Sequence, residues 1–233
     1  MNNSLLQIKI KQRLNKLASM DYDNLECWMI QEAFNKAQLE WTRRQFHGLN
    51  LKKEGPEQSI NTVDDLQVLL KQQLLNGVHS KRYFESELIA ADYMHFVRMS
   101  ADAKTDCCPE RALSIYQVEE ANVDVLLSDD FKNPSFEWAE TFCTVFSNKI
   151  RIYTESKFTV VNPMLTYYRK PREVRFVGCV DPSTGQTSSA DVTCELKDDI
   201  CEIIIDEAAA ILSGDVESLN QYQRQIQNAQ RNS

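Results

Sequence analysis

The chain has 233 residues, of which 42% are apolar and 26% charged, so it can bury a real core as one large domain or two small ones. Its 26 basic and 34 acidic residues give a net charge of −8, whereas a protein that grips a nucleic-acid backbone normally carries a basic excess. No stretch approaches the roughly 18 apolar residues of a membrane span, and the N-terminal sequence is not typical of a secretory signal peptide.

The first part of the sequence predicts helices. Apolar residues recur at helical spacing at Leu6, Ile10, Leu14 and Leu17. A second helix is expected from a capping box, with Asp23 as N-cap and Glu26 three residues later, to about Gln45. Its apolar stripe comprises Ile30, Phe34, Ala37 and Trp41. A third helix is predicted over 63–75, and the stripes favour packing of these helices against one another.

The middle of the sequence predicts strands. Residues 83–88 and 112–118 have β-rich composition, and 92–99 form an ambiguous amphipathic turn. From Phe142 onward the apolar period is close to two, in short runs that break at 147–148, 155–156 and 162–163. Because short loops join antiparallel neighbours, these runs predict a meander, and a last strand is expected around 192–194.

The end of the sequence predicts a helix and then a polar segment. Ile200, Ile204, Ala208, Ile211 and Leu212 share one helical face. Asp198 and Asp199 load the first turn with charge that suits the helix dipole, and Gly214 fits the cap. From Asp215 to Ser233 glutamine and asparagine dominate, and only a thin apolar seam continues, at Val216, Leu219, Tyr222 and Ile226. Such a segment either frays as a tail or docks along a neighbouring subunit, which makes these four residues the candidate interface with a subunit or portal.

The elements together predict an α+β fold, in which N- and C-terminal helices form a helical bundle with an inserted antiparallel β-rich subdomain. We expect an N-terminal helical part over 1–80 and a β-rich part over 81–195. The C-terminal helices and tail, 196–233, are expected to pack on the helical part and on neighbouring subunits.

The sequence predicts no catalytic, cofactor-binding or metal-binding residue. Six glycines provide no phosphate-cradling motif, and the three histidines lack zinc-site spacing. His95, beside aromatic and aliphatic residues, is a general base only on the less favoured interpretation. The acidic pairs at 64–65, 129–130 and 198–199 are better explained as helix caps than as metal ligands or acid–base groups.

The seven cysteines bear on redox environment. Their odd number and the absence of C-x-x-C spacing argue against a disulfide framework and for a reducing compartment, so we expect synthesis in a cytoplasm. Cys107 and Cys108 are adjacent, and adjacent cysteines cannot easily both face one tetrahedral metal.

Three stretches resemble one family. They are FNKAQLEWTRRQFHG at 34–48 followed by VDDLQVLL at 63–70, LLSDDFKNPSFEWAETF at 126–142, and LTYYRKPREV at 165–174 leading into ELKDDICEIIIDEAAAIL. In order and spacing they are similar to the head-to-tail connector ring proteins, or portal adaptors, of crAss-like short-tailed bacteriophages. The family's last helix usually follows a Leu-Pro-like lead-in, where this chain has Leu196 and Lys197.

The resemblance implies a virion protein made in the host cytoplasm. It implies a dodecameric ring below the portal, with portal and tail proteins as partners, and no catalytic residue. Double-stranded DNA would pass through the lumen without specific binding during ejection. A negative wall would let the duplex slide, although the same charge also simply serves solubility. Another minor virion or tail component, or a cytosolic enzyme with an unrecognised site, remains the alternative.

Overall fold

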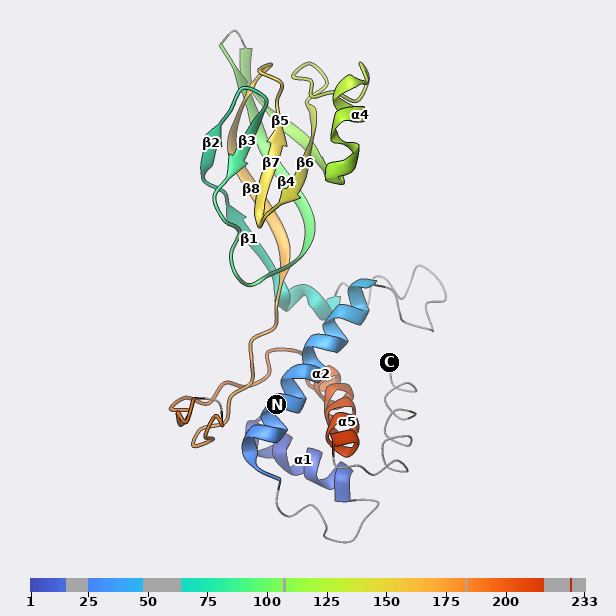
Figure 1. The fold of residues 1–233 in the computed structure, drawn as a ribbon, viewed down its shortest axis with the longest axis vertical. Coiled ribbons are helices and arrows are strands. Elements are labelled where there is room, and N and C mark those ends of the chain that lie inside the picture. The colour runs from blue at the N-terminus through green and yellow to red at the C-terminus, as the bar shows by residue number, and fades with distance from the viewer. Residues whose placement is uncertain (16–24, 48–63, 107, 183, 216–226, 228–233) are drawn as a thin grey trace. The chain divides into compact units, whose positions relative to one another are not determined.

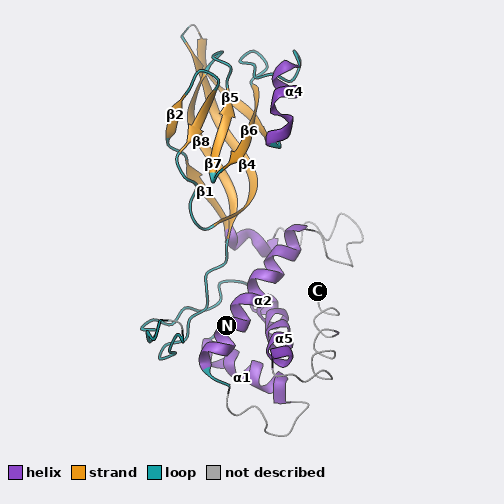
Figure 2. Cartoon of the chain, viewed as in Figure 1, coloured by secondary structure: helices purple, strands orange, loops and turns teal. Residues whose placement is uncertain are grey.

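The computed structural model describes residues 1–15, 25–47, 64–106, 108–182, 184–215 and 227. The chain divides into two compact units. Residues Met1–Val68 and Pro171–Ser233 form the first, which we call the helical unit, and Leu69–Lys170 form the second, the sheet unit (Figures 1 and 2).

Three helices make up the core of the helical unit: α1 (Asn3–Asn15), α2 (Cys27–His47) and α5 (Asp198–Asp215). Helix α5 packs against both α1 and α2. Of the residues that the sequence placed on apolar stripes, Ile211 is only partly buried, and the following are buried: Leu6, Ile10, Leu14, Ile30, Phe34, Ala37, Trp41, Ile200, Ile204, Ala208 and Leu212. The predicted stripes are therefore confirmed, whereas Leu17 and the proposed cap Asp23 lie outside the described residues.

The sheet unit contains one eight-stranded sheet in the order β1-β8-β4-β5-β6-β7-β3-β2. Its strands are β1 (Leu70–Leu74), β2 (Gly77–His79), β3 (Tyr83–Ser86), β4 (Tyr93–Thr105), β5 (Cys108–Gln117), β6 (Glu140–Phe146), β7 (Lys149–Tyr153) and β8 (Thr159–Arg169). Its core is a cluster of buried apolar side chains from nearly every strand, among them Phe84, Met99, Ile152, Leu165 and Tyr167.

The sheet is strongly curled, because its two outermost strands are consecutive in the chain. Strand β1 pairs with β8 at one edge and β2 pairs with β3 at the other. Only Leu75 and Asn76 separate them. The N–H of Leu75 donates to the carbonyl of Pro163 (2.8 Å), and the carbonyl of Asn76 accepts from Glu87 (2.7 Å). Leu75 is thus bonded toward β8, and the next residue, Asn76, is bonded toward β3. Strands β1 and β2 form one nearly continuous strand, which joins the two edges of the sheet.

The pair β5–β6 is parallel, and the other described strand pairs of the sheet are antiparallel. A parallel pair needs a crossover connection, which here contains a short 3₁₀ turn (Glu120–Asn122) and α4 (Val123–Ser128). Val123, Leu126 and Leu127 pack with Phe142 of β6 and Tyr153 of β7, outside the central cluster. Helix α4 therefore covers the outer face of the sheet beside β6 (Figure 1).

The predicted fold class is wrong. The described part of the chain is dominated by a large curled mixed sheet of eight strands with few helices, and is not a helical bundle carrying an antiparallel subdomain. The physical reason lies in two segments and one connection. Residues 70–74 were expected to be helical and 92–99 to form a turn, but both pair with β8, and the crossover through α4 makes one strand pair parallel.

The predicted meander is also wrong beyond its first hairpin. Strands β6 and β7 are antiparallel neighbours, but β7 then pairs with β3, and β8 lies between β1 and β4. Asn162 and Pro163 do not separate two strands, because they lie inside β8. Asn162 has a positive φ of 49° next to a register shift opposite β4, and such a bulge tolerates proline. Around 192–194 only an isolated bridge, Arg175–Val192, is present in the described residues.

Candidate interaction surfaces

The predicted interface residues Val216, Leu219, Tyr222 and Ile226 lie outside the described residues. Exposed side chains elsewhere therefore provide the candidate site. His95 is exposed on β4, opposite Tyr168 of β8. Within the described residues, no three His, Cys, Asp or Glu side chains gather in a way that could hold a metal ion.

The acidic pairs form ordinary ion pairs and hydrogen bonds. Asp64 and Asp65 both accept hydrogen bonds from Lys197, and this pairing raises the pKa of Lys197. Asp129 accepts from the backbone N–H of Phe131 (2.9 Å) and fixes a turn. Asp198 pairs with the N-terminal ammonium of Met1 (2.6 Å) in the first turn of α5. Each pair is thus engaged by a cation or by backbone.

One polar cluster ties the edge strand β1 to the rest of the sheet. Lys71 lies opposite Tyr167 across the β1–β8 pair, and both donate to Asp92, over 2.7 and 2.8 Å. Burial alone would raise the pKa of Asp92, but the hydrogen bonds from Lys71 and Tyr167 lower it below its usual range. Burial and then the bond to Asp92 raise the pKa of Tyr167. The mutual satisfaction of these groups indicates a structural role.

A second polar cluster joins β3 to β7. Glu85 accepts from Lys149 (2.8 Å) and Arg151 (2.9 Å), and these bonds lower the pKa of Glu85. The Arg151 guanidinium also lies over the rings of Tyr83 and Phe146, at 5.1 and 4.2 Å. The cluster links neighbouring strands on the outer face of the sheet.

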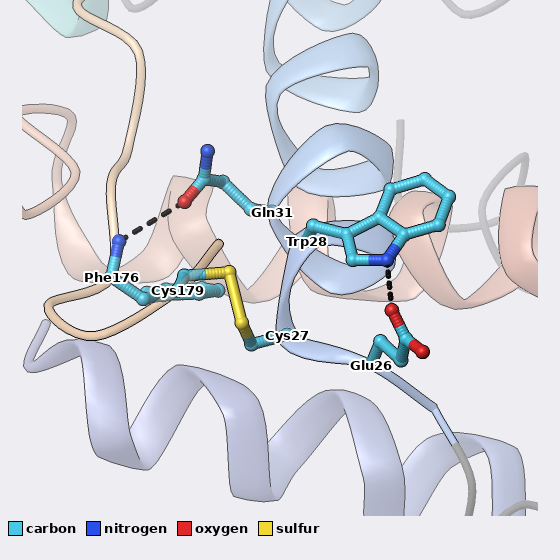
Figure 3. The surroundings of a disulfide bond; sticks show 6 residues. All are labelled: Glu26, Cys27, Trp28, Gln31, Phe176 and Cys179. Atoms are coloured by element: carbon cyan, nitrogen blue, oxygen red, sulfur yellow. Dashed lines mark hydrogen bonds between the residues drawn. A yellow bond between two sulfur atoms is a disulfide. The ribbon is translucent and has the colours of Figure 1, made fainter. Parts of the chain in front are cut away.

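Side-chain amides on α2 hold an extended segment that follows the sheet unit. The amide of Asn35 bonds both backbone groups of Val174, donating over 3.0 Å and accepting over 2.8 Å. Gln31 accepts from the N–H of Phe176 (3.1 Å), and Gln38 donates to the carbonyl of Arg172 (3.2 Å). One row of amides along the helix thus substitutes for a strand partner; Figure 3 shows the bond between Gln31 and Phe176.

A disulfide between Cys27 and Cys179 fastens the same segment to the start of α2 (Figure 3). The odd number and the spacing of the cysteines argued against a disulfide framework, and the structure has this bond all the same. The two residues are 152 positions apart, so no local cysteine spacing predicts that they pair. Elsewhere in the helical unit, the buried Cys201 thiol donates to the Cys194 sulfur over 3.0 Å, which raises the pKa of Cys201.

The crossover between β5 and β6 carries the two most exposed large apolar side chains among the described residues. Phe131 is 96% exposed and Trp138 is 79% exposed, and Val125 of α4 is 67% exposed. These three residues are hereafter the crossover surface. Burying such side chains against a partner is favourable, and aromatic residues of this kind dominate many protein interfaces.

The loop that presents Phe131 and Trp138 is held by many hydrogen bonds. Lys157 donates to the Asn133 side chain and to the Pro134 carbonyl, each over 2.9 Å. Arg111 of β5 donates to the carbonyl of Glu137 (3.0 Å), and Ser135 forms a bridge with Glu140. The aromatic side chains therefore project from a fixed backbone, which reduces the entropy that binding would cost.

A second exposed apolar row lies on the strand that closes the sheet. Leu70, Leu74 and Val78 are 43, 52 and 72% exposed. Alternate residues of a strand face the same side of a sheet. Leu75 points into the central cluster, and so does Phe84, the residue of β3 that lies opposite His79. Leu70, Leu74 and Val78 therefore share the outer face, and we call them the strand stripe.

Sequence reasoning missed both surfaces. The crossover lies within a stretch noted only for family resemblance, and its aromatic residues follow no period. Leu70 and Leu74 of the strand stripe were assigned to the helix predicted over 63–75, in which they would also share a face, and Val78 lay beyond it. In the crossover, acidic residues stand next to aromatic residues in the sequence, and this was the available signal for an exposed surface.

Comparisons with known proteins add no family. The sequence matches no protein-family model, and no curated protein is significantly similar to it. No helix in the described ranges combines the length and apolarity that a membrane crossing would need.

Proposed function

We propose that this chain is a virion structural protein, a subunit of an oligomeric ring in the head-to-tail connector of a tailed bacteriophage. The observation that carries the proposal is the crossover surface, on which Phe131 and Trp138 are exposed on a hydrogen-bonded loop. Fixed, exposed aromatic residues are typical of protein assembly sites. The resemblance of three sequence stretches to portal adaptors supplies the position below the portal.

The proposal assigns the chain no catalytic role. Its partners are further copies of itself, with twelve as the expected number, the portal protein and other tail proteins. The ring forms part of the channel through which DNA leaves the capsid, and carboxylates line that channel so that the duplex slides without binding. A lumen lined mainly by arginine and lysine contradicts this last part.

Electron microscopy of the purified protein, alone and mixed with the portal protein of the same virus, tests the proposal. The expected result is a closed ring that binds one face of the portal. A protein that stays monomeric and does not bind the portal refutes it. A ring found at another position in the virion reassigns the chain to a different tail component.

The C-terminal seam has its own test. Truncation after Gly214 removes Val216, Leu219, Tyr222 and Ile226, and we expect a folded protein that no longer assembles onto the portal. Full-length and truncated chains are compared under the same conditions by microscopy and circular dichroism. Unchanged assembly of the folded, truncated chain argues against a docking role for the seam.

A further inference from the structure

We infer that the crossover surface of one copy binds the strand stripe of a second copy, in a head-to-tail contact between sheet units. The inference deepens the proposed function and rests on it for the closure of such contacts into a ring. Three independent features of the sheet unit support it: the position of the two surfaces, their charges and their fixed geometry.

The two surfaces lie on opposite sides of the same curled sheet. In the order β1-β8-β4-β5-β6-β7-β3-β2 the closing strand β1–β2 is at the ends and β5 and β6 are in the middle. Figure 1 shows α4 on one side of the sheet unit and β2 and β3 on the other. Different surfaces on opposite sides cannot satisfy each other within one copy, but they can between successive copies.

The surfaces have opposite charge. Residues 119–140 contain seven carboxylates and one lysine, a net charge of −6. Beside the strand stripe, Glu85 lies opposite Val78 and is neutralised by Lys149 and Arg151. Lys81 and Arg82 follow β2 in the chain and add positive charge. Lys71 faces the other side of the strand, where it pairs with Asp92, whereas Arg82 is 72% exposed and reaches Glu155 only at 3.9 Å. Opposite potentials steer these surfaces together.

The same charges disfavour the symmetric alternative. A two-fold contact would place two crossover segments, each with a net charge of −6, against each other. Like charges across an interface cost binding free energy. Heterologous association therefore satisfies both surfaces, and contacts of that type close into rings when the rotation between copies fits.

The strand stripe is long enough to receive the crossover. From Leu70 to Val78 the strand advances eight residues, roughly 26 Å at about 3.3 Å per residue. Its backbone is paired to β8 on one side and to β3 on the other. The contact is consequently made by side chains on a formed sheet surface, and not by addition of a strand to a free edge.

Sedimentation velocity of the full chain tests the inference with two variants. The crossover variant, Phe131→Ser with Trp138→Ser, and the stripe variant, Leu74→Gln with Val78→Thr, each remove one surface and keep the other. Each alone is expected to self-associate about tenfold or more weakly than the natural protein. Val177→Ser, at a 64% exposed valine of the helical unit, is the matched control and is expected to assemble normally.

Mixing the two variants gives the decisive result. Each retains the surface that the other lacks, so an equimolar mixture is expected to form a one-to-one dimer, which ends there because the outer surfaces are blocked. A mixture that stays monomeric overturns the inference, as does a stripe variant that assembles like the natural protein. Circular dichroism and thermal unfolding confirm that both variants are folded.

The failure of this inference differs from failure of the proposed function. A natural protein that is monomeric but binds the portal, or that forms rings unaffected by either variant, refutes the inference alone. Self-association that depends on both surfaces, in a protein that binds no portal and occurs in no virion, refutes the proposed function alone.

Discussion

Asn35 forms two hydrogen bonds with the backbone of Val174, a residue whose side chain is completely buried. An amide can replace the donor and acceptor of a neighbouring strand, so this residue lets an extended segment pack beside a helix without leaving its polar backbone groups unpaired. Gln31 and Gln38, at preceding and following turns of α2, extend the same pattern.

Asn35→Ala is expected to lower the free energy of unfolding by about 1–3 kcal/mol, because buried backbone groups lose their partners. Urea unfolding followed by fluorescence measures the change. Glu32→Ala, an exposed position on the same helix, is the matched control and is expected to have little effect. Equal stability of the two variants contradicts the proposed role of the amide.

Asp92 gives the molecule a defined sensitivity to acid. Its pKa is lowered in the folded state, so the carboxylate contributes stability above its unfolded pKa of about 3.9, and this contribution is lost as the pH falls through the folded pKa. The carboxylate is about a third exposed, so solvent screening keeps the effect modest.

Asp92→Asn is expected to reduce stability near neutral pH and to unfold with a weaker dependence on acid pH than the natural protein. The melting temperatures of the two proteins should therefore converge as the pH falls from about 6 to about 2, where the natural carboxylate also becomes neutral. A difference in melting temperature that is constant over this range contradicts the assignment.

At the scale of elements, Gly77 permits the strand that closes the sheet. A Cβ atom at this position would lie 2.1 Å from the carbonyl oxygen of Glu85 and 2.7 Å from the Phe84 ring. The first atom is backbone and is fixed by the β2–β3 pair. The close approach of two strands therefore requires a residue without a side chain.

Gly77→Ala is expected to destabilise the protein by roughly 1–3 kcal/mol through overpacking, and to loosen β2 from β3. Chemical denaturation measures the first effect and amide hydrogen exchange at β2 the second. Gly185→Ala is a useful comparison, because nothing lies within 4 Å of the added atom and only its positive φ of 67° opposes the change. Faster exchange in β2 is expected for the first variant only.

Periodicity predicted the elements whose environment is local, and failed where distant pairing decides. The stripes of α1, α2 and α5 are one-sided because each helix buries one face, and β6 and β7 form a short hairpin. Residues 70–74 have apolar spacing that suits a helix as well as a strand, and only pairing with β8 makes them a strand. The partner lies about 95 positions away, between 164 and 168.

The candidate site was less accessible to sequence reasoning than the fold. Phe131 and Trp138 are residue types that usually become buried, and a sequence does not reveal that the loop turns them outward. The position of the strand stripe opposite the crossover depends on the complete strand order. Both facts arise from long-range pairing, so neither can be obtained from a local pattern.

At the scale of the whole molecule, acidity is concentrated and not uniform. The crossover segment 119–140 accounts for −6 of the total charge of −8. If a neighbouring copy covers these carboxylates, they are not available to line a lumen. The carboxylate-lined lumen and the contact between copies thus require the same charges. A reconstruction of the ring will show whether residues 119–140 face the lumen or a neighbouring copy.

The disulfide also acts at the scale of the whole chain, because it joins residues 152 positions apart. Replacing both Cys27 and Cys179 by serine is expected to lower the free energy of unfolding by about 2–4 kcal/mol, since the unfolded chain gains freedom. Thermal unfolding with and without reductant measures this loss of stability. Reductant is expected to lower the melting temperature of the natural protein and to leave that of the double variant unchanged. Cys108→Ser, at an exposed position, is the control and should unfold like the natural protein.

The same bond also determines the covalent topology of the chain. All of Leu69–Lys170 lies between Cys27 and Cys179 in sequence. While the disulfide is intact, a protease cut at any exposed loop of the sheet unit opens a ring and releases no fragment. Tension applied to the chain outside these two cysteines likewise passes through the sulfur bridge, so the sheet unit bears no load until the bridge is reduced.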